Sequence, residues 1–424
     1  MLLLDYIKRQ FSNSFIRNVG WLAGAELFNR ILRVVAVIIL ARLLSAYDYG
    51  LVAIILATNE FSSIFALKGG IGAKLIQADQ ADLPLLAETA YWMNWLLGIF
   101  LFFLQCLASF PIAWFYENNQ LIFPICVSGI VYLISPFFSV QSALIYREER
   151  LNIIAVCNAL QAVVGNILTI LFAYLGMGLW AVVLPISLTP FVWLAVILKE
   201  QSWRPKSKFT LYQWQVIFHY STGILGIEVL NKIRANLDYL LVGRFIGLEA
   251  LGVYYFAFNA GLGISLNLLN AVSWSIFPHL CEARGDLKLL HQRYFNSQKK
   301  IALITVPFII LQAILAPFYV PIVYGQKWIS AIPILMIICF SAIPRPFAEA
   351  ASKLLQAINK VKIDLYWNLI FTVFFSAVLI IAVNWNILGV AIAVLIAHAI
   401  ALPIFTSWVH KYVFLYKLDI PKLQ

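Results

Sequence analysis

The stretch ARLLSAYDYGLVA at residues 41–53 lies between two long apolar runs, and its pattern recurs later in the chain. Residues 243–255 read GRFIGLEALGVYY, so an Arg is again followed by a Gly eight positions later. A fixed offset of 202 residues aligns residues 26–52 with residues 228–254 without a gap. Glu, Asn, Ile, Arg and Gly are identical at five aligned positions, which favours an internal duplication over a chance match of apolar residues.

The amino-acid composition predicts a membrane protein. Only 12% of the residues are charged and 62% are hydrophobic, whereas soluble domains have about 25% charged residues. A membrane-spanning helix needs roughly 20 mostly apolar residues, and such runs recur through nearly the whole chain. The predicted spans are residues 16–40, 48–68, 84–110, 119–145, 153–175, 178–198, 216–242, 250–280, 300–322, 330–357, 363–384 and 386–410.

The distribution of Lys and Arg between these spans predicts the orientation of the chain, because cytoplasmic loops carry an excess of both. Of the 30 Lys and Arg, three lie opposite the termini, namely Arg42, Arg244 and Lys327, and five lie within spans. The other 22 lie on the side that holds both termini, so we expect both termini in the cytoplasm. The net charge of +11 then reflects this orientation near anionic lipids, and nucleic-acid binding is not expected.

The duplication predicts an all-α integral membrane protein with about 12 transmembrane helices in two six-helix halves. We expect an N-terminal half at residues 1–200, a basic cytoplasmic linker at 201–214 and a C-terminal half at 215–424. Since each half begins in the cytoplasm, a pseudo-two-fold axis along the membrane normal relates them, as in transporters that bind substrate between their halves. The alternative is that duplication only built a stable helix bundle.

We interpret the repeated Arg and Gly as paired helix ends with a structural role. Arg42 and Arg244 are expected at helix C-termini, where a cation meets the negative end of the helix dipole. Gly50 and Gly252 are expected to start the returning helices, where Gly allows either close packing or an unusual backbone angle.

The first and seventh predicted spans each carry a polar stripe with spacings of three and four residues. The stripes consist of Glu26, Asn29, Arg30 and Arg33 in the first span, and of Glu228, Asn231 and Lys232 in the seventh. A charge at the centre of a span costs about 2.5 to 3.5 kcal/mol on insertion scales, so intramembrane charges are functional candidates. We expect the two stripes to face a central cavity rather than lipid.

A second interpretation is that these charges neutralise each other within a helix, since several oppositely charged residues are four apart. The pairs are Glu26 with Arg30, Glu228 with Lys232, Arg234 with Asp238, and Arg345 with Glu349. Arg33 and Glu60 have no partner at this spacing, and either pair with each other or contact substrate.

Arg345 lies between Pro344 and Pro346, which interrupt the helical hydrogen bonds. Irregular backbone at membrane depth is tolerated where protein or a wet cavity covers it. We therefore expect that Arg345 at this kink contacts an anion, that the kink acts as a hinge, or that it is a purely structural bend.

Catalytic motifs are missing from the sequence, which contains no HExxH, GxSxG or Walker pattern. We expect a protein that is not an enzyme and that needs neither a cofactor nor a metal. Without an ATP site, transport would draw on the membrane potential or an ion gradient. Glu26, Glu60, Glu228 and Asp238 are candidates for proton or cation coupling.

Residues 40–77, LARLLSAYDYGLVAIILATNEFSSIFALKGGIGAKLIQ, resemble the N-terminal signature of a known family. It is the family of bacterial polysaccharide transporters, the Wzx-type O-antigen and exopolysaccharide flippases of the multidrug/oligosaccharidyl-lipid/polysaccharide exporter superfamily. In that signature an ARLLSxxDYG turn leads through the second helix to a GxGxxLIQ end. Ala41–Gly50 and Gly70–Gln77 hold these positions here.

The resemblance implies two six-helix lobes around a cationic cavity in the bacterial cytoplasmic membrane. It further implies that undecaprenyl-diphosphate-linked oligosaccharides are flipped to the outer leaflet for surface polysaccharide biosynthesis. Basic residues of the first and seventh helices are the family's diphosphate contacts, here Arg30, Arg33 and Lys232. To these we add Arg345 from the kink, and Asn29 and Asn231 from the stripes.

Expected partners are the lipid-linked oligosaccharide, membrane lipids, and a polysaccharide polymerase with its chain-length machinery. The protein itself is expected to be a monomer. The alternative function is that of an ion-coupled drug or metabolite exporter with the same fold.

Overall fold

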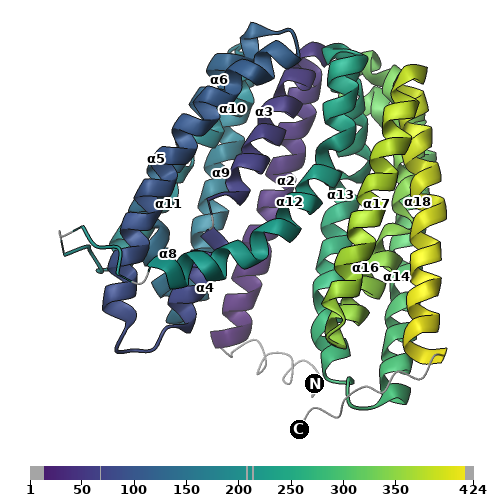
Figure 1. The fold of residues 1–424 in the computed structure, drawn as a ribbon. Coiled ribbons are helices and arrows are strands. Elements are labelled where there is room, and N and C mark those ends of the chain that lie inside the picture. Colours follow the sequence, from purple (N-terminus) through teal and green to yellow (C-terminus); the bar gives the residue numbers. More distant parts are fainter. Residues whose placement is uncertain (1–13, 67, 207–208, 213, 416–424) are drawn as a thin grey trace, which may run out of the picture. The chain divides into compact units, whose positions relative to one another are not determined.

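The computed structural model describes residues 14–66, 68–206, 209–212 and 214–415, and all regular structure in these ranges is helical (Figure 1). Within them, the side chains of residues 14–27, 68–69, 216, 220–228, 231 and 263–275 are not described. The chain divides into two compact units. Unit 1 comprises Met1–Ser45 and Ile55–Glu228, and unit 2 comprises Ala46–Ile54 and Val229–Gln424.

Unit 1 is built from the helices of the first half of the chain. They are α2 (Ser14–Leu43), most of α3 (Ala46–Ile64), α4 (Lys68–Gln77), α5 (Leu83–Phe115), η1 (Asn119–Leu121), α6 (Ile122–Ser128), α7 (Val131–Ile134), α8 (Pro136–Arg147), α9 (Leu151–Tyr174), α10 (Trp180–Leu188) and α11 (Pro190–Glu200). The first part of α12 (Trp214–Phe245) also belongs to this unit.

Unit 2 contains the rest of α12, the first turns of α3 and the helices that follow. These are α13 (Leu248–Cys281), α14 (Leu287–Tyr319), η2 (Val320–Tyr324), η3 (Gln326–Ala331), α15 (Ile332–Ala342), α16 (Arg345–Ala357), α17 (Val361–Ala382), η4 (Val383–Trp385), α18 (Asn386–His410) and η5 (Lys411–Leu415). Helices α13, α16, α17 and α18 pack together in this unit.

Each predicted apolar span overlaps with one helix or with a consecutive set of helices, although α14 begins at Leu287, thirteen residues before the span predicted at 300–322. Among the described residues, six helical segments are long and apolar enough to cross a membrane by length and composition. A seventh is possible if Asn119–Ile134 and Pro136–Arg147, which meet at an angle of 51°, form one bent span. The protein therefore has an all-helical, multi-span architecture, while the count of about 12 spans stays a prediction.

The repeated Arg and Gly lie where the duplication predicts helix ends. Arg42 and Arg244 lie in the last turns of α2 and α12. Gly50 and Gly252 are each the fifth residue of the following helix, α3 and α13. Their backbones are not in the left-handed region, so close packing accounts for these two glycines.

Polar side chains join the helices of unit 1 within its core. The Nε2 of Gln105 on α5 donates to the Ile125 carbonyl at 2.8 Å, to Ser128 Oγ at 3.0 Å and to Asn59 Oδ1 at 3.2 Å. The Tyr132 hydroxyl donates to the Asn59 carbonyl at 3.2 Å. One buried amide thus holds α3, α5 and α6 together, where apolar packing alone would not fix their register.

The C-terminus of α4, which carries the GxGxxLIQ pattern, is capped by Arg147 from α8. Its Nη1 donates to the carbonyls of Leu75 at 2.9 Å, of Ile76 at 3.0 Å and of Ala78. A helix end leaves carbonyls without intrahelical partners, and a guanidinium satisfies several at once while meeting the negative end of the dipole.

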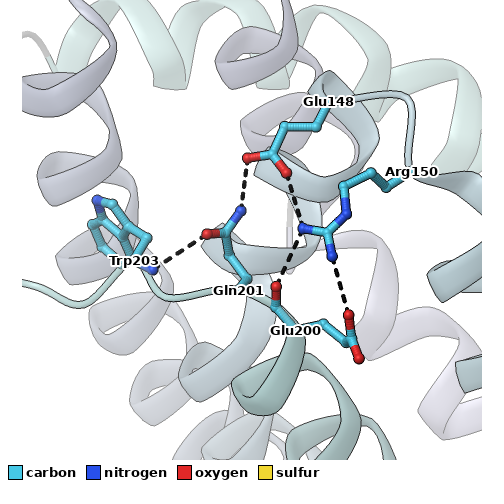
Figure 2. A network of polar contacts seen from close by, with 5 residues as sticks. All are labelled: Glu148, Arg150, Glu200, Gln201 and Trp203. Carbon is cyan, nitrogen blue, oxygen red and sulfur yellow. Dashed lines mark hydrogen bonds and ion pairs between the residues drawn. The ribbon is translucent and has the colours of Figure 1, made fainter.

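The segment after α11 is held against the same end of unit 1 by polar contacts, shown in Figure 2. Arg150 forms ion pairs with Glu148 at 3.2 Å and with Glu200 at 3.0 Å. The Nε2 of Gln201 donates to Glu148 Oε1 at 2.8 Å, while its Oε1 accepts from the backbone N–H of Trp203 at 3.3 Å.

Further along the predicted linker, two hydrogen bonds tie the chain to the start of α5. The backbone N–H of Lys206 donates to Glu88 Oε1 at 2.7 Å, and the Thr89 hydroxyl donates to the Tyr212 carbonyl at 2.9 Å. The described part of the predicted linker therefore runs along unit 1.

Replacing Arg147 by Ala should destabilise the protein by about 1.5–3 kcal/mol, because charged hydrogen bonds to the α4 carbonyls are lost. A lower thermal unfolding midpoint of the detergent-purified protein would report this loss. Lys74→Ala, which removes a positive charge from the last turn of α4 itself, is the matched control and should have a smaller effect. Equal midpoints for the two variants would contradict the capping role.

Candidate functional site

The polar stripe of α2 does not lie in a single environment. Asn29 is buried at 7% exposure, and its Oδ1 has no hydrogen-bond partner in the described part of the chain. Arg30 and Arg33 are exposed. The two predicted anion contacts of α2 are therefore accessible, while Asn29 lies on the packed side of the helix. The side chain of Glu26 lies outside the described residues.

The corresponding residues of α12 and the acidic residue of α3 are only partly described. Lys232 is half-buried and Glu60 is exposed, and both have interaction partners. The side chains of Glu228 and Asn231 lie outside the described residues. Whether the two stripes face one cavity, and whether Arg33 pairs with Glu60, stay predictions.

Unit 2 contains a group of buried and half-buried charged and polar residues, contributed by five of its helices. We call it the buried charge cluster and define it as Arg234 and Asp238 of α12, Tyr254 of α13, Arg345 of α16, Asp364 and Asn368 of α17, and His398 of α18. Asp238, Tyr254, Asp364 and His398 are each less than 9% exposed. Two arginines and two aspartates make the cluster formally neutral when His398 is neutral.

One part of the cluster surrounds Asp238. Its Oδ2 accepts from the Tyr254 hydroxyl at 2.9 Å, and its Oδ1 accepts from the backbone N–H of Tyr239 at 3.0 Å. The carboxylate also acts electrostatically on Arg345. The cluster thus brings together Asp238, predicted for ion coupling, and Arg345, predicted as an anion contact.

The other part surrounds Asp364. Its Oδ1 accepts from Ser352 Oγ at 2.7 Å and from Asn368 Nδ2 at 3.2 Å, and its Oδ2 accepts from Gln356 Nε2 at 2.9 Å. Arg234 Nη1 donates to Asn368 Oδ1 at 2.6 Å. Asn368 therefore bridges the guanidinium of α12 and the carboxylate of α17, so these charges stabilise each other through hydrogen bonds across the bundle.

Arg345 occupies the break that the two prolines predict. Helix α15 ends at Ala342 and α16 begins at Arg345, with Pro344 as the preceding residue. The guanidinium lies 6.0 Å from the ring centre of Phe258. Its Nε is buried without a hydrogen-bond partner among the described residues, as is Nδ1 of His398. Two polar atoms thus remain available to a ligand, a water or an ion at this point.

The residues of unit 1 that align with the charged residues of this cluster are uncharged. At the offset of 202, Arg234 and Asp238 correspond to Leu32 and Ala36. At the offset of 210 that aligns Pro136 with Pro346, Arg345 corresponds to Ser135, and Asp364 corresponds to Ile154. The charged chemistry is therefore specific to the second repeat.

Unit 1 contains instead a cavity of about 500 Å³ between α4, α5, α7, α8, α9 and α11. The described residues that line it are mostly apolar, with Asn94, Ser139, Ser142 and Gln161 among the polar ones and no charged side chain. The cavity volume suits a small ligand, but an anion would find no cation here. The predicted diphosphate site is therefore not this cavity.

Sequence reasoning missed Asp364, Asn368, Tyr254 and His398. Asp364 and Asn368 are four apart at the start of an apolar span, which is the pattern that singled out the other charges. No local pattern distinguishes Tyr254 or His398, since the partners of both come from other helices. In the described part of the chain, no three His, Cys, Asp or Glu residues are grouped as metal ligands would be.

Comparison with known proteins matches residues 39–333 to the polysaccharide biosynthesis protein family. The teichuronic acid biosynthesis protein TuaB of Bacillus subtilis is 27% identical over 310 residues, which cover 70% of this chain and 62% of TuaB. The chain thus spans less than two thirds of that relative. The lipopolysaccharide biosynthesis protein WzxC of Escherichia coli is 24% identical over 375 residues, covering 86% of this chain and 74% of WzxC.

Two solved structures share the fold at low sequence identity. The lipid II flippase MurJ in an inward closed conformation superposes with a TM-score of 0.75 and 15% identity, covering 92% of this chain and 87% of MurJ. An inward-facing multidrug resistance transporter of the MATE family gives a TM-score of 0.71 and 14% identity, covering 92% of this chain and 96% of that transporter.

The family match covers well over half of the chain, and the fold is shared with these two multi-span transporters. The chain therefore belongs to the polysaccharide biosynthesis protein family.

Proposed function

We propose that this protein translocates undecaprenyl-diphosphate-linked oligosaccharide units across the bacterial cytoplasmic membrane by alternating access, for surface polysaccharide biosynthesis. The observation that carries the proposal is the pair of exposed cations, Arg30 and Arg33, on α2 of a chain whose family serves polysaccharide biosynthesis. The fold shared with a lipid II flippase supports it. Guanidinium groups bind phosphate oxygens in a bidentate manner, which suits a diphosphate head group.

The proposal includes the finer architecture expected from the sequence. About 12 spans form two six-helix halves, related by a pseudo-two-fold axis along the membrane normal, with the linker at 201–214 and both termini in the cytoplasm. Arg30, Arg33 and Lys232, assisted by Asn29 and Asn231, contact the diphosphate. The monomer hands its substrate to a polysaccharide polymerase and chain-length machinery on the outer side.

Replacing Arg30, Arg33 or Lys232 by Ala should reduce surface polysaccharide by about tenfold or more. Each loses a charged hydrogen bond worth about 1.5–3 kcal/mol, and 1.4 kcal/mol corresponds to a factor of ten. The measurement is polymer yield in a deletion strain complemented with each variant at equal membrane levels. The charge-retaining controls Arg30→Lys, Arg33→Lys and Lys232→Arg should keep more activity. Normal polymer from all three Ala variants would overturn the anion site.

The proposal further assigns ion coupling to acidic residues within spans. Asp238 carries this role best among the described candidates, because it is buried next to Arg345 in the buried charge cluster. Protonation or cation binding at Asp238 would change the charge felt by Arg345, which connects the two roles. Glu26, Glu60 and Glu228 remain candidates of the same kind.

Asp238→Asn and Arg345→Gln should each destabilise the protein by about 1.5–3 kcal/mol, because Asp238 loses charged hydrogen bonds in the first variant and the nearby positive charge in the second. The double variant should be less destabilised than the sum of the two, measured by thermal unfolding in detergent. If Asp238 couples an ion, the double variant restores folding but not polysaccharide export. Normal export by the double variant would show that the pair is only structural.

The alternative, an ion-coupled drug or metabolite exporter of the same fold, makes a different prediction for a deletion strain. Loss of a flippase should leave lipid-linked glycan on the cytoplasmic leaflet, whereas loss of an exporter should leave the glycan unchanged and raise drug sensitivity. Leaflet-specific detection of the glycan in the deletion strain distinguishes them.

A further inference from the structure

Helix α4 forms one wall of the cavity in unit 1. It contributes five lining residues, namely Ile71, Gly72, Ala73, Leu75 and Ile76, all within the GxGxxLIQ stretch at residues 70–77. The other walls come from helices of the same unit, so the cavity is complete within unit 1. The proposed diphosphate contacts do not involve this stretch, and its place on a cavity wall therefore calls for a separate role.

The lining of the cavity suits a hydrocarbon chain. Its four polar side chains each donate a hydrogen bond to protein, Asn94 to the Ala90 carbonyl at 2.8 Å, Ser139 to the Ser135 carbonyl at 2.7 Å, Ser142 to the Phe138 carbonyl at 2.7 Å and Gln161 to Thr189 Oγ1 at 3.2 Å. Trp193 adds a buried Nε1 without a partner among the described residues. A glycan, with its many hydroxyl groups, would find few partners here, whereas apolar side chains make up most of the lining.

The depth of the cavity corresponds to one leaflet of the membrane. Asn94 lies 11 residues after the start of α5 at Leu83, and Gln161 lies 10 residues after the start of α9 at Leu151. Both helices begin on the side predicted to be cytoplasmic, and a rise of 1.5 Å per residue places these two side chains about 15–17 Å from that side. Half of the hydrocarbon core is about 15 Å thick. The cavity therefore lies at the level of the cytoplasmic leaflet.

The cavity reaches the surface near the ends of α4 and α8, which pack against each other in unit 1 (Figure 1). Ile76 and Tyr146 line it there, one residue before the ends of these helices, and are 41% and 43% exposed. An aliphatic side chain and an aromatic ring with a polar tip suit the boundary between hydrocarbon and head groups. A lipid chain can thus enter from the leaflet in which the substrate is made.

Small residues keep the space in front of α4 open. A β-carbon built on Gly72 would have its nearest neighbour, Ala143 Cβ, only at 4.0 Å, which is an ordinary van der Waals distance. A chain that leaves the bilayer for this cavity exchanges one hydrocarbon environment for another, so the hydrophobic effect contributes little and the fit of the chain to the wall decides binding. A methyl-branched isoprenyl chain and a straight acyl chain differ in exactly this respect, namely in shape.

We propose that the cavity of unit 1 binds a segment of the polyisoprenyl chain of the lipid-linked substrate while that substrate is in the cytoplasmic leaflet. The proposal rests on the function proposed above and extends it from the diphosphate to the hydrocarbon part of the molecule. A volume of about 500 Å³ holds a drug-sized segment. Arg30 and Arg33 belong to the same unit, so one unit binds both parts of the substrate.

The test is photo-crosslinking of the purified protein in vesicles of phosphatidylethanolamine and phosphatidylglycerol, with undecaprenyl phosphate that carries a diazirine in its chain. Peptide mass spectrometry should find the label on residues 71–76 and 138–146. Gly72→Leu fills the cavity and should lower this labelling about tenfold, which corresponds to about 1.4 kcal/mol. Gly285→Leu is the matched control, since a β-carbon there meets nothing within 4 Å, and it should keep full labelling.

A second probe, phosphatidylethanolamine with a diazirine in a saturated acyl chain, identifies the source of the chain. It should label these residues weakly, and unlabelled undecaprenyl phosphate should displace the polyisoprenyl probe where excess phospholipid does not. Equal labelling by both probes would show a site for any lipid chain and overturn the proposal. So would labelling that a folded Gly72→Leu variant leaves unchanged. If that variant does not fold, Ser142→Leu adds bulk from the opposite wall, and the competition in the unaltered chain decides.

The crosslinking does not require translocation. Labelling of the cavity in a protein whose deletion leaves the lipid-linked glycan unchanged would retain the chain-binding site and refute the proposed function. A deletion that traps the glycan on the cytoplasmic leaflet, together with a cavity that the polyisoprenyl probe does not label, would do the reverse.

Discussion

A charge inside a membrane-embedded bundle must find its partners within the protein, and the structure of unit 2 depends on this constraint. Asp238 and Asp364 accept hydrogen bonds from α12, α13, α16 and α17, while Arg234 reaches α17 through Asn368. Because the contacts of Asp238 with Tyr254, of Asp364 with Ser352 and of Arg234 with Asn368 join different helices, these charges help to fix how the helices are arranged. The break at Pro344 supports this arrangement, since it brings Arg345 to the cluster at the start of α16.

The two repeats satisfy their polar groups in different ways. Unit 1 uses neutral amides, such as Gln105 between α3, α5 and α6, and contains a cavity without charged lining among the described residues. Unit 2 uses hydrogen-bonded charged residues at positions where unit 1 has Leu32, Ala36 and Ile154. The aligned positions of the two halves thus differ in charge, while the helical plan is alike.

Hydropathy predicted where helices lie, and the attraction between a cation and the negative end of a helix dipole predicted that Arg42 and Arg244 lie at helix ends. Both predictions succeeded because helix position and helix ends depend on local sequence. Spacing along one helix could not predict that Asn29 is buried while Arg30 and Arg33 are exposed, since packing against another helix decides it. The partners of Asp238 were missed for the same reason. Tyr254 is 16 residues away and Arg345 more than 100, so only the folded bundle brings them together.

A β-carbon on Gly50 would overlap with the Leu248 carbonyl oxygen, and one on Gly252 with the Ala46 carbonyl oxygen, and this reciprocal contact bears on the origin of the chain. Had a single repeat first assembled as a homodimer, these glycines would have been one residue meeting its own copy at the symmetry axis. A mutation there would have introduced two side chains at once, so that glycine would have been under a doubled steric constraint. Fusion of such repeats would have separated the two positions genetically, so that each could change alone and the chain could become asymmetric at this contact.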